Sequence, residues 1–203
     1  DFALAHVGIA HVCGRIYELH DHKPRWIERG WAACDRALLL DANLPEGLAA
    51  RARIYYAQRK YDDAIQYARK ALERKPNCED AYNILGRALM NADRLEEAAG
   101  IADRAIEVSG DDYNVYIPYR IVFGRLGRKN SAAGLRLKFA KTLERQIELV
   151  PEDARARILL ATAYVEDGRT SEATEQLRRA MELRPEDANI HYNAACAYGL
   201  MAD

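Results

Sequence analysis

The chain has 203 residues, of which 30 are basic and 31 acidic, so its formal net charge is −1. This balance argues against a nucleic-acid partner, which would require a net basic surface. No apolar run approaches the ~20 residues of a membrane-spanning helix, so no membrane partner is expected. The sequence begins Asp1-Phe2 and shows no signal peptide, which suggests a segment of a longer protein.

The four cysteines lie far apart and form no CxxC pair. Three of them fall where a helix face calls for a small apolar residue, which is typical of buried, reduced cysteine side chains. We therefore expect a reducing compartment and predict a cytoplasmic location.

The first predicted helix covers residues 2–20 and its partner about 25–41. The partner carries small residues at i, i+4 and i+7, namely Gly30, Cys34 and Ala37. This spacing places them on one face of a helix, where another helix can pack closely. The turn between the two helices, around His20–Pro24, is about four residues longer than the later turns.

Residues 45–110 contain the same helical hairpin twice with no residue gained or lost. Ala64 and Ala98 lie 34 residues apart, and so do Ala71 and Ala105. A period of this length predicts a stack of helical hairpins. Asn77 is the predicted N-cap of the helix that begins near Asp80.

The fourth hairpin is irregular. Its first helix, about 112–126, contains Pro118, which predicts a kink or a late start. Its second helix, about 131–150, is about seven residues longer than its counterparts, close to two helical turns, so its apolar face is preserved. The fifth hairpin returns to the regular period.

The motif Tyr82-x2-Leu85-Gly86-x2-Leu89, followed by Ala98-x3-Ala102 and Ala105, resembles the tetratricopeptide repeat. The resemblance implies an all-α fold, an α-α superhelix of about five and a half hairpins with 11 helices and no strands. The chain is predicted to form a single solenoid over 1–203. The predicted repeats are approximately 2–44, 45–78, 79–112, 113–153 with the elongated second helix, 154–187, and a partial repeat over 188–203.

No stretch of the sequence carries a catalytic or metal-binding motif. His6 and His11 are five residues apart and lie on different helix faces, and no cysteine or carboxylate is spaced to complete a metal site. No phosphate-binding glycine loop or nucleophile motif is present. We therefore predict no enzyme activity, no metal and no cofactor.

In the tetratricopeptide family the first helices of successive hairpins line a concave groove, and this implies a ligand-binding face. The ninth place of each repeat and its neighbours one turn away supply the predicted groove residues. These are His11, Arg15, Arg53, Tyr56, Asn83, Arg87, Asn91, Ile117, Ile121, Arg125, Ile158 and Thr162.

Three successive arginines make the first half of this face suited to an anion. Because guanidinium groups bind carboxylates in a fixed bidentate geometry, we predict a protein or peptide partner with an acidic or C-terminal carboxylate near Arg15–Arg87. The alternative is that Glu18, Glu46 and Asp80 simply pair with these arginines. The lysines with which some co-chaperones of this family hold a terminal carboxylate are missing.

The predicted function is a non-catalytic interaction scaffold. The elongated fourth hairpin and the Tyr192–Tyr198 helix also resemble repeat segments of bacterial signalling proteins such as nucleotide cyclases and protein kinases. This resemblance implies the alternative of a regulatory region whose catalytic domain lies elsewhere. The helix over 188–203 has apolar residues on several sides, so either a following helix or self-association with a second copy would cover it.

Overall fold

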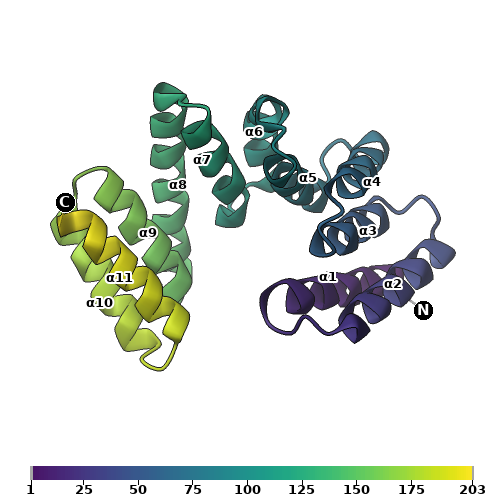
Figure 1. Ribbon diagram of the computed structural model, residues 1–203, viewed down its shortest axis with the longest axis horizontal. Helices are drawn as coiled ribbons and strands as arrows, with labels where there is room; N and C mark the ends of the chain where they lie inside the picture. The colour runs from purple at the N-terminus through teal and green to yellow at the C-terminus, as the bar shows by residue number, and fades with distance from the viewer. Residues whose placement is uncertain (1, 203) are drawn as a thin grey trace. The chain divides into compact units, whose positions relative to one another are not determined.

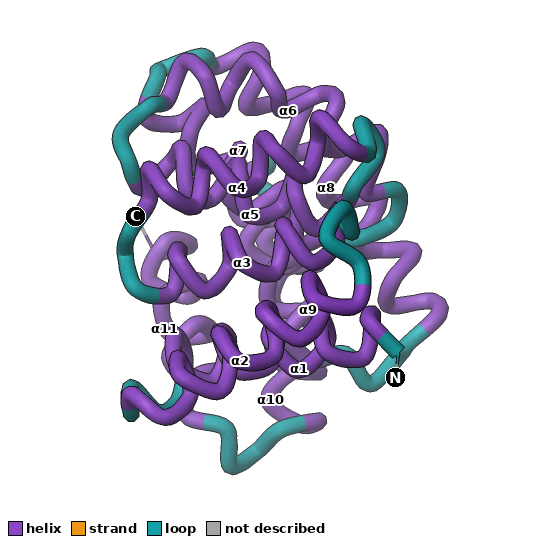
Figure 2. Tube along the Cα trace, turned by 90° about the vertical axis from the view of Figure 1, so that its right-hand side faces the viewer, coloured by secondary structure: helices purple, strands orange, loops and turns teal. Residues whose placement is uncertain are grey.

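The computed structural model describes residues 2–202, and within that range it contains eleven α-helices, one 3₁₀ helix and no strand (Figures 1 and 2). The helices are α1 Ala3–Leu19, α2 Pro24–Leu40, α3 Pro45–Ala57, α4 Tyr61–Arg74, α5 Glu79–Asn91, α6 Leu95–Ser109, η1 Tyr113–Val115, α7 Tyr116–Arg125, α8 Lys129–Leu149, α9 Ala154–Glu166, α10 Thr170–Leu183 and α11 Ala188–Ala202. The all-α prediction and its count of helices are confirmed.

The chain divides into two compact units, residues 1–110 with 117–127, and residues 111–116 with 128–203. We call them the N-terminal and C-terminal units. A single solenoid over 1–203, with its six repeats, stays a prediction, and residues 1 and 203 at its two ends lie outside the described residues.

In the N-terminal unit the hairpins α1–α2, α3–α4 and α5–α6 pack one after another, and the first helices α1, α3 and α5 are neighbours. The alanines with i, i+4, i+7 spacing are buried: Ala64, Ala68 and Ala71 of α4 are fully covered, as are Ala98 and Ala105 of α6. Small residues on each second helix therefore allow the close packing that the sequence period predicts.

The turns between paired helices repeat as regularly as the helices. Arg59, Asp93 and Gly127 follow α3, α5 and α7 at successive intervals of 34 residues, and each has a positive φ, between 60° and 64°. After α3, the Lys60 amide donates to the carbonyl oxygen of Tyr55 (3.0 Å). A left-handed residue with this bond is a standard way to end a helix. Gly168 takes the same role after α9, seven residues later than the period would place it.

Two glycines mark the closest helix contacts of the N-terminal unit. A methyl group at Gly30 would lie 2.5 Å from Cδ1 of Ile54, and one at Gly86 would lie 2.5 Å from the hydroxyl of Tyr119. Real Cβ contacts are essentially never this short, so a larger residue at either position would force the neighbouring side chain or helix to shift.

The fourth hairpin contains the seven-residue insertion predicted from its length. Helix α8 has 21 residues, compared with 14 in α4 and α10. Its core residues Phe139 and Leu143 are fully buried, so the insertion keeps the apolar face in register. The late start near Pro118 is also confirmed, because a 3₁₀ turn over Tyr113–Val115 comes before α7.

The caps of the helices differ from the prediction at one place. Cys78, not Asn77, is the N-cap residue of α5, and no side chain caps this helix. Side-chain caps form at other helices: Oδ1 of Asp153 accepts from the Ala156 amide at the start of α9 (2.9 Å), and Oδ1 of Asp187 accepts from the Asn189 amide at the start of α11 (2.9 Å). Asp153 follows a proline turn and directly precedes the helix, a position favoured for an N-cap.

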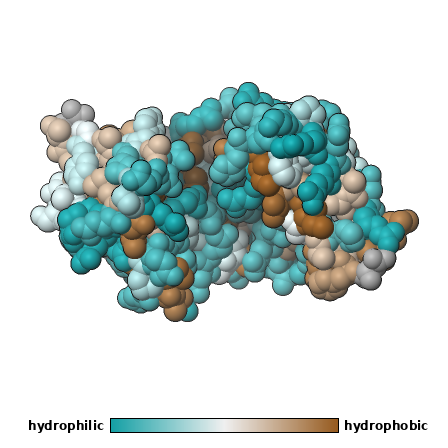
Figure 3. All heavy atoms as spheres, turned by 90° about the horizontal axis from the view of Figure 1, so that it is seen from below, coloured by the Kyte–Doolittle hydropathy of each residue, from teal (hydrophilic) through white to brown (hydrophobic). Residues whose placement is uncertain are grey.

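Exposed large apolar side chains are unevenly distributed. They occur on α1, α2, α7, α8, α10 and α11, whereas none occurs on α3–α6. Figure 3 shows one face of the molecule, on which apolar groups are scattered over a mainly hydrophilic surface. On α11, Tyr192 is 70% exposed and Leu200 58%. Helices α3 and α5, which carry several of the predicted groove residues, therefore have no large exposed apolar side chain.

Candidate functional site

The candidate site is a polar cluster on the first helices of the N-terminal unit. Arg15 comes from α1, Arg53 from α3, and Asn83 and Arg87 from α5. The sequence makes room for Arg53 at Gly14 of α1, where a methyl group would lie 3.2 Å from Cγ of Arg53. The aliphatic part of this arginine therefore packs on the backbone of the neighbouring helix and fixes the position of its guanidinium.

Arg53 and Arg87 share one neutral acceptor. Nη2 of Arg53 donates to Oδ1 of Asn83 (3.4 Å), and Nε of Arg87 donates to the same oxygen (3.2 Å). Both arginines are only partly exposed. Among residues 2–202, no carboxylate forms an ion pair with either guanidinium. Two cations are therefore held close together by a single uncharged oxygen.

None of the three carboxylates predicted to neutralise these arginines is in contact with Arg53 or Arg87. Glu46 accepts a hydrogen bond from Lys75 (2.7 Å). Asp80 lies 3.7 Å from Nδ1 of His11. Glu18 and Asp80 are near enough to act on the charge of Arg53, but neither is in contact with it. The simple pairing of groove arginines with Glu18, Glu46 and Asp80 does not occur among the described residues.

The electrostatics of the cluster reflect this arrangement. Burial, followed by the nearby Arg87 guanidinium, lowers the pKa of Arg53. Burial also lowers the pKa of His11 to about 4, although the Asp80 carboxylate opposes the shift. His11 is therefore uncharged at neutral pH, and its buried Nε2 has no hydrogen-bond partner. The cluster contains three arginines (Arg15, Arg53 and Arg87) and two carboxylates (Glu18 and Asp80), so it has an excess of positive charge.

The remaining predicted residues of the N-terminal unit extend from this cluster. Nδ2 of Asn91 donates both to the hydroxyl of Tyr56 (3.1 Å) and to the carbonyl oxygen of Arg87 (2.9 Å). Arg125 pairs with Asp93 (2.5 Å). Ile121 is 45% exposed. Ile117 is partly buried.

Two predicted residues belong to the C-terminal unit. Ile158 is 5% exposed and packs into the core of that unit. Oγ1 of Thr162 donates to the carbonyl oxygen of Ile158 (3.0 Å), so its hydroxyl is used within α9. The structure brings Arg15, Arg53, Asn83, Arg87 and His11 into one cluster, and it places these two residues elsewhere in the chain.

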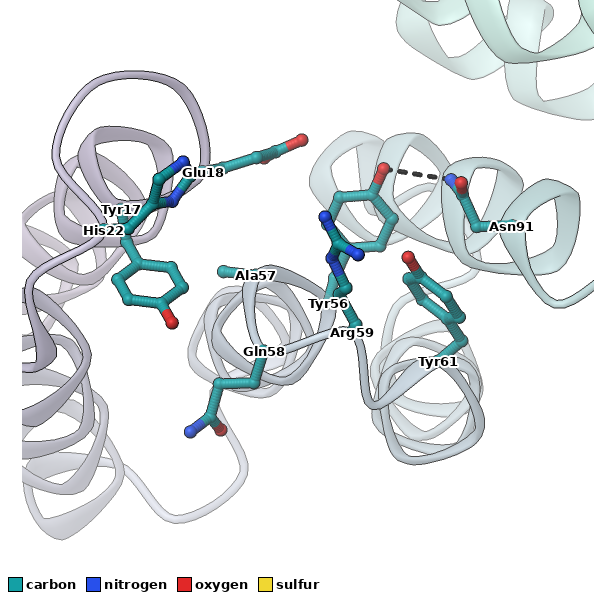
Figure 4. A pocket seen from close by; sticks show the side chains of 9 residues that line it. All are labelled: Tyr17, Glu18, His22, Tyr56, Ala57, Gln58, Arg59, Tyr61 and Asn91. Carbon is teal, nitrogen blue, oxygen red and sulfur yellow. Dashed lines mark hydrogen bonds between the residues drawn. The ribbon is translucent and has the colours of Figure 1, made fainter.

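A polar pocket of about 640 Å³ lies at the end of the cluster, where α1 and α3 end and α4 begins (Figure 4). Three tyrosines, a carboxylate, two side-chain amides, a histidine, an arginine and an alanine line it: Tyr17, Glu18, His22, Tyr56, Ala57, Gln58, Arg59, Tyr61 and Asn91. Figure 4 shows Glu18 extending from α1 into the space, with Tyr56 and Tyr61 on the opposite side. Tyr56 and Asn91 thus belong to the predicted groove and also line the pocket.

Two family profiles match parts of this chain. A profile described as "Tetratricopeptide repeat" matches residues 49–113, and one described as "TPR repeat" matches residues 161–201. Together they cover just over half of the chain. The chain belongs to the tetratricopeptide repeat family. Comparison with curated proteins found no significant match.

Solved structures of tetratricopeptide repeat proteins share this fold. TTC0263 from Thermus thermophilus is 22% identical with a TM-score of 0.65, and the alignment covers 95% of this chain and 98% of that protein. YrrB, described as a TPR protein with an unusual peptide-binding site, is 21% identical with a TM-score of 0.53 over 98% of this chain and 92% of its own. MamA is 24% identical with a TM-score of 0.55 over 84% and 97%.

The tetratricopeptide repeat pattern alone did not reveal most of the pocket. Tyr17 fits the packing spacing of α1, and Gln58, Arg59 and Tyr61 fall in or beside a turn. One signal was present in the sequence: Tyr17, Tyr56 and Tyr61 all lie within about one helical turn of a predicted hairpin turn. Aromatic residues at successive hairpin ends can therefore point to a pocket that the groove positions miss.

Proposed function

We propose that this tetratricopeptide repeat protein is a non-catalytic scaffold that binds a protein or peptide partner on the polar face of α1, α3 and α5. The repeat family and its structural neighbours support a protein-interaction scaffold in general. In the finer proposal, a carboxylate of the partner lies between Arg53 and Arg87.

The shared acceptor carries this proposal. A guanidinium has five N–H donors, and Arg53 and Arg87 each use one of theirs on the same Asn83 oxygen. A partly buried cation without a counter-ion is unfavourable, and a carboxylate can accept two parallel bonds from an arginine. An acidic side chain or a C-terminal carboxylate would therefore compensate both charges. YrrB shows by its description that a fold of this kind can carry a peptide-binding site.

The test compares affinities within matched peptide pairs. Each pair differs only in Glu against Gln, or in a free against an amidated C-terminus, and fluorescence anisotropy reports binding. Arg87→Gln should weaken binding of the carboxylate form by about tenfold or more, because hydrogen bonds to charged groups are worth roughly 1.5–3 kcal/mol. Arg104→Gln is the control, since it removes the same charge from α6, where Arg104 pairs with Glu107 (2.8 Å).

The control should bind the peptide with an affinity within about twofold of the parent, because exposed ion pairs contribute little. Helical circular dichroism checks that both variants are folded. Equal affinities of Arg87→Gln and Arg104→Gln for the carboxylate peptide would show that the arginine pair is not the binding site.

The cellular setting and self-association are part of the same proposal. The cysteines are free and three are buried, which supports a reducing, cytoplasmic location. No helix within residues 2–202 is long and apolar enough to cross a membrane. The exposed Tyr192 and Leu200 support self-association through 188–203. Sedimentation at increasing protein concentration tests self-association, and a mass that stays monomeric would contradict it.

A further inference from the structure

The pocket beside the arginine cluster contains acceptors without donors. Glu18 forms no ion pair with any residue in 2–202, although its carboxylate extends into the pocket (Figure 4). The side-chain oxygen of Gln58 is buried and accepts no hydrogen bond. An ionised carboxylate is an acceptor only, so a ligand group that satisfies it must donate.

The aromatic residues of the pocket favour a donor with positive charge. The rings of Tyr56 and Tyr61 lie 5.7 Å apart at an angle of 51°, and Tyr17 lies on the other side of the pocket with Glu18. The face of a tyrosine ring attracts ammonium and guanidinium groups. Tyrosine rings and an unpaired carboxylate that line the same pocket therefore suit a cation that carries N–H donors.

One lining residue opposes this charge. Arg59 is exposed and lies in the turn between α3 and α4, with φ of 60°. Its guanidinium lies beside the Tyr56 ring in Figure 4, so it competes with a bound cation, although its exposure to solvent weakens that effect. Glu18 is half-buried at the end of α1, where its field is screened less. Of these two charges, that of Glu18 is the less screened, and it is also near enough to the neighbouring cluster to act on the Arg53 guanidinium.

The pocket is connected to the arginine pair through one hydrogen-bonded residue. Asn91 donates to Tyr56 in the pocket wall and to the carbonyl oxygen of Arg87, which lies one helical turn earlier on α5. A short segment of a bound chain can therefore reach both places. Its acidic group would lie at the arginines and a basic side chain at Glu18.

We propose that this pocket receives a lysine or arginine side chain of the partner. The inference rests on the proposed function in one respect, that the occupant belongs to the same peptide. Binding of the cation itself depends only on Glu18 and the tyrosines. The partner recognised by this face would then carry an acidic and a basic group a few residues apart.

The test uses a small probe without a carboxylate. N-acetyl-arginine amide carries a guanidinium, and N-acetyl-citrulline amide has nearly the same shape without the charge. In an NMR titration the arginine probe should shift the side-chain amide signals of Gln58 and Asn91, whereas the citrulline probe should leave them in place. Glu18→Gln should weaken binding of the arginine probe by about three- to tenfold.

Two control variants determine which charge the pocket prefers. Glu73→Gln removes an equal charge from the exposed side of α4 and should change the affinity less than about twofold. Arg59→Gln should leave the affinity unchanged or increase it. The proposal is overturned if Glu18→Gln has no effect, or if Arg59→Gln weakens binding and both probes bind equally. Since the probe has no carboxylate, these outcomes are independent of the peptide series with Arg87→Gln.

Discussion

Gly86 offers a sharp test of how closely the helices of the N-terminal unit pack. The residue lies inside α5, and an alanine there would place its Cβ 2.5 Å from the Tyr119 hydroxyl and 2.8 Å from Cζ of the same ring. Tyr119 is fully buried, so its ring has no free space to enter. Either the ring or the helix must shift.

The size of the effect follows from two opposing contributions. Replacing a helical glycine by alanine gains about 1 kcal/mol of helix propensity. Overpacking a buried site costs about 1–3 kcal/mol. The two contributions sum to a net loss of about 0–2 kcal/mol, and we expect Gly86→Ala to lie toward the upper end, because three atoms of the rigid Tyr119 side chain lie within 3.2 Å of the new methyl group.

Gly100 provides the matched control. It lies within α6, and a methyl group there would meet nothing within 4 Å. Gly100→Ala should therefore raise the free energy of unfolding by about 0.5–1 kcal/mol. Urea unfolding followed by tryptophan fluorescence reports on the correct unit, because Trp26 and Trp31 both lie on α2.

A second substitution identifies the atom responsible. The Tyr119 hydroxyl is buried without a hydrogen-bond partner, so Tyr119→Phe should be neutral or stabilising by up to about 1 kcal/mol. In the Gly86→Ala background it should recover part of the loss. If Gly86→Ala is as stable as Gly100→Ala, the close contact between α5 and α7 is wrong.

Three further predictions concern pH, capping and thiol access. Burial lowers the pKa of His11 to about 4 from an ordinary 6.5. The unfolded chain therefore takes up a proton that the folded chain refuses, and the free energy of unfolding should fall by up to roughly 3 kcal/mol between pH 6.5 and pH 4. His11→Gln should flatten that part of the pH profile measured by urea unfolding. Asp153→Ala removes the cap of α9 and should cost about 1 kcal/mol of stability or more in thermal or urea unfolding, whereas the exposed Glu152→Ala should be nearly neutral. In the native protein one thiol, that of the exposed Cys196, should react with a thiol reagent, and all four should react after unfolding.

The sequence predicted the hairpins well because their packing depends on local spacing. Alanines at i, i+4 and i+7 define a helix face without reference to any other part of the chain, and Ala64, Ala68 and Ala71 are buried as that rule requires. The longer α8 could also be predicted, since an insertion close to two turns preserves the face that holds Phe139.

The candidate site could be predicted only in part. Counting around the helix correctly brought Arg53, Asn83 and Arg87 together, because the first helices of neighbouring hairpins lie side by side. Their pairing could not be predicted, since it depends on which side-chain rotamer each residue adopts. Asp80 lies near His11 and Glu46 binds Lys75. Arg53 and Arg87 therefore donate to the neutral Asn83 oxygen and not to a carboxylate.

The pocket was missed because it is formed by helix ends. Tyr17 and Glu18 at the end of α1 lie across from Tyr61 at the start of α4 only because the turn after α3 reverses the chain within three residues. A left-handed residue, Arg59, makes that reversal possible. The period of the repeat gives helix faces, but it does not give the direction in which side chains at helix ends point.

The central claim is that a partner's carboxylate binds between Arg53 and Arg87, and side-chain NMR of the arginines tests it most directly. The Nε–H of Arg87 already donates to Asn83, so its signal reports any new acceptor. Addition of a carboxylate peptide should shift the Nε–H signals of Arg53 and Arg87, and the amidated or glutamine form should not. Arginine signals that stay in place while the peptide binds and shifts signals elsewhere would contradict the claim.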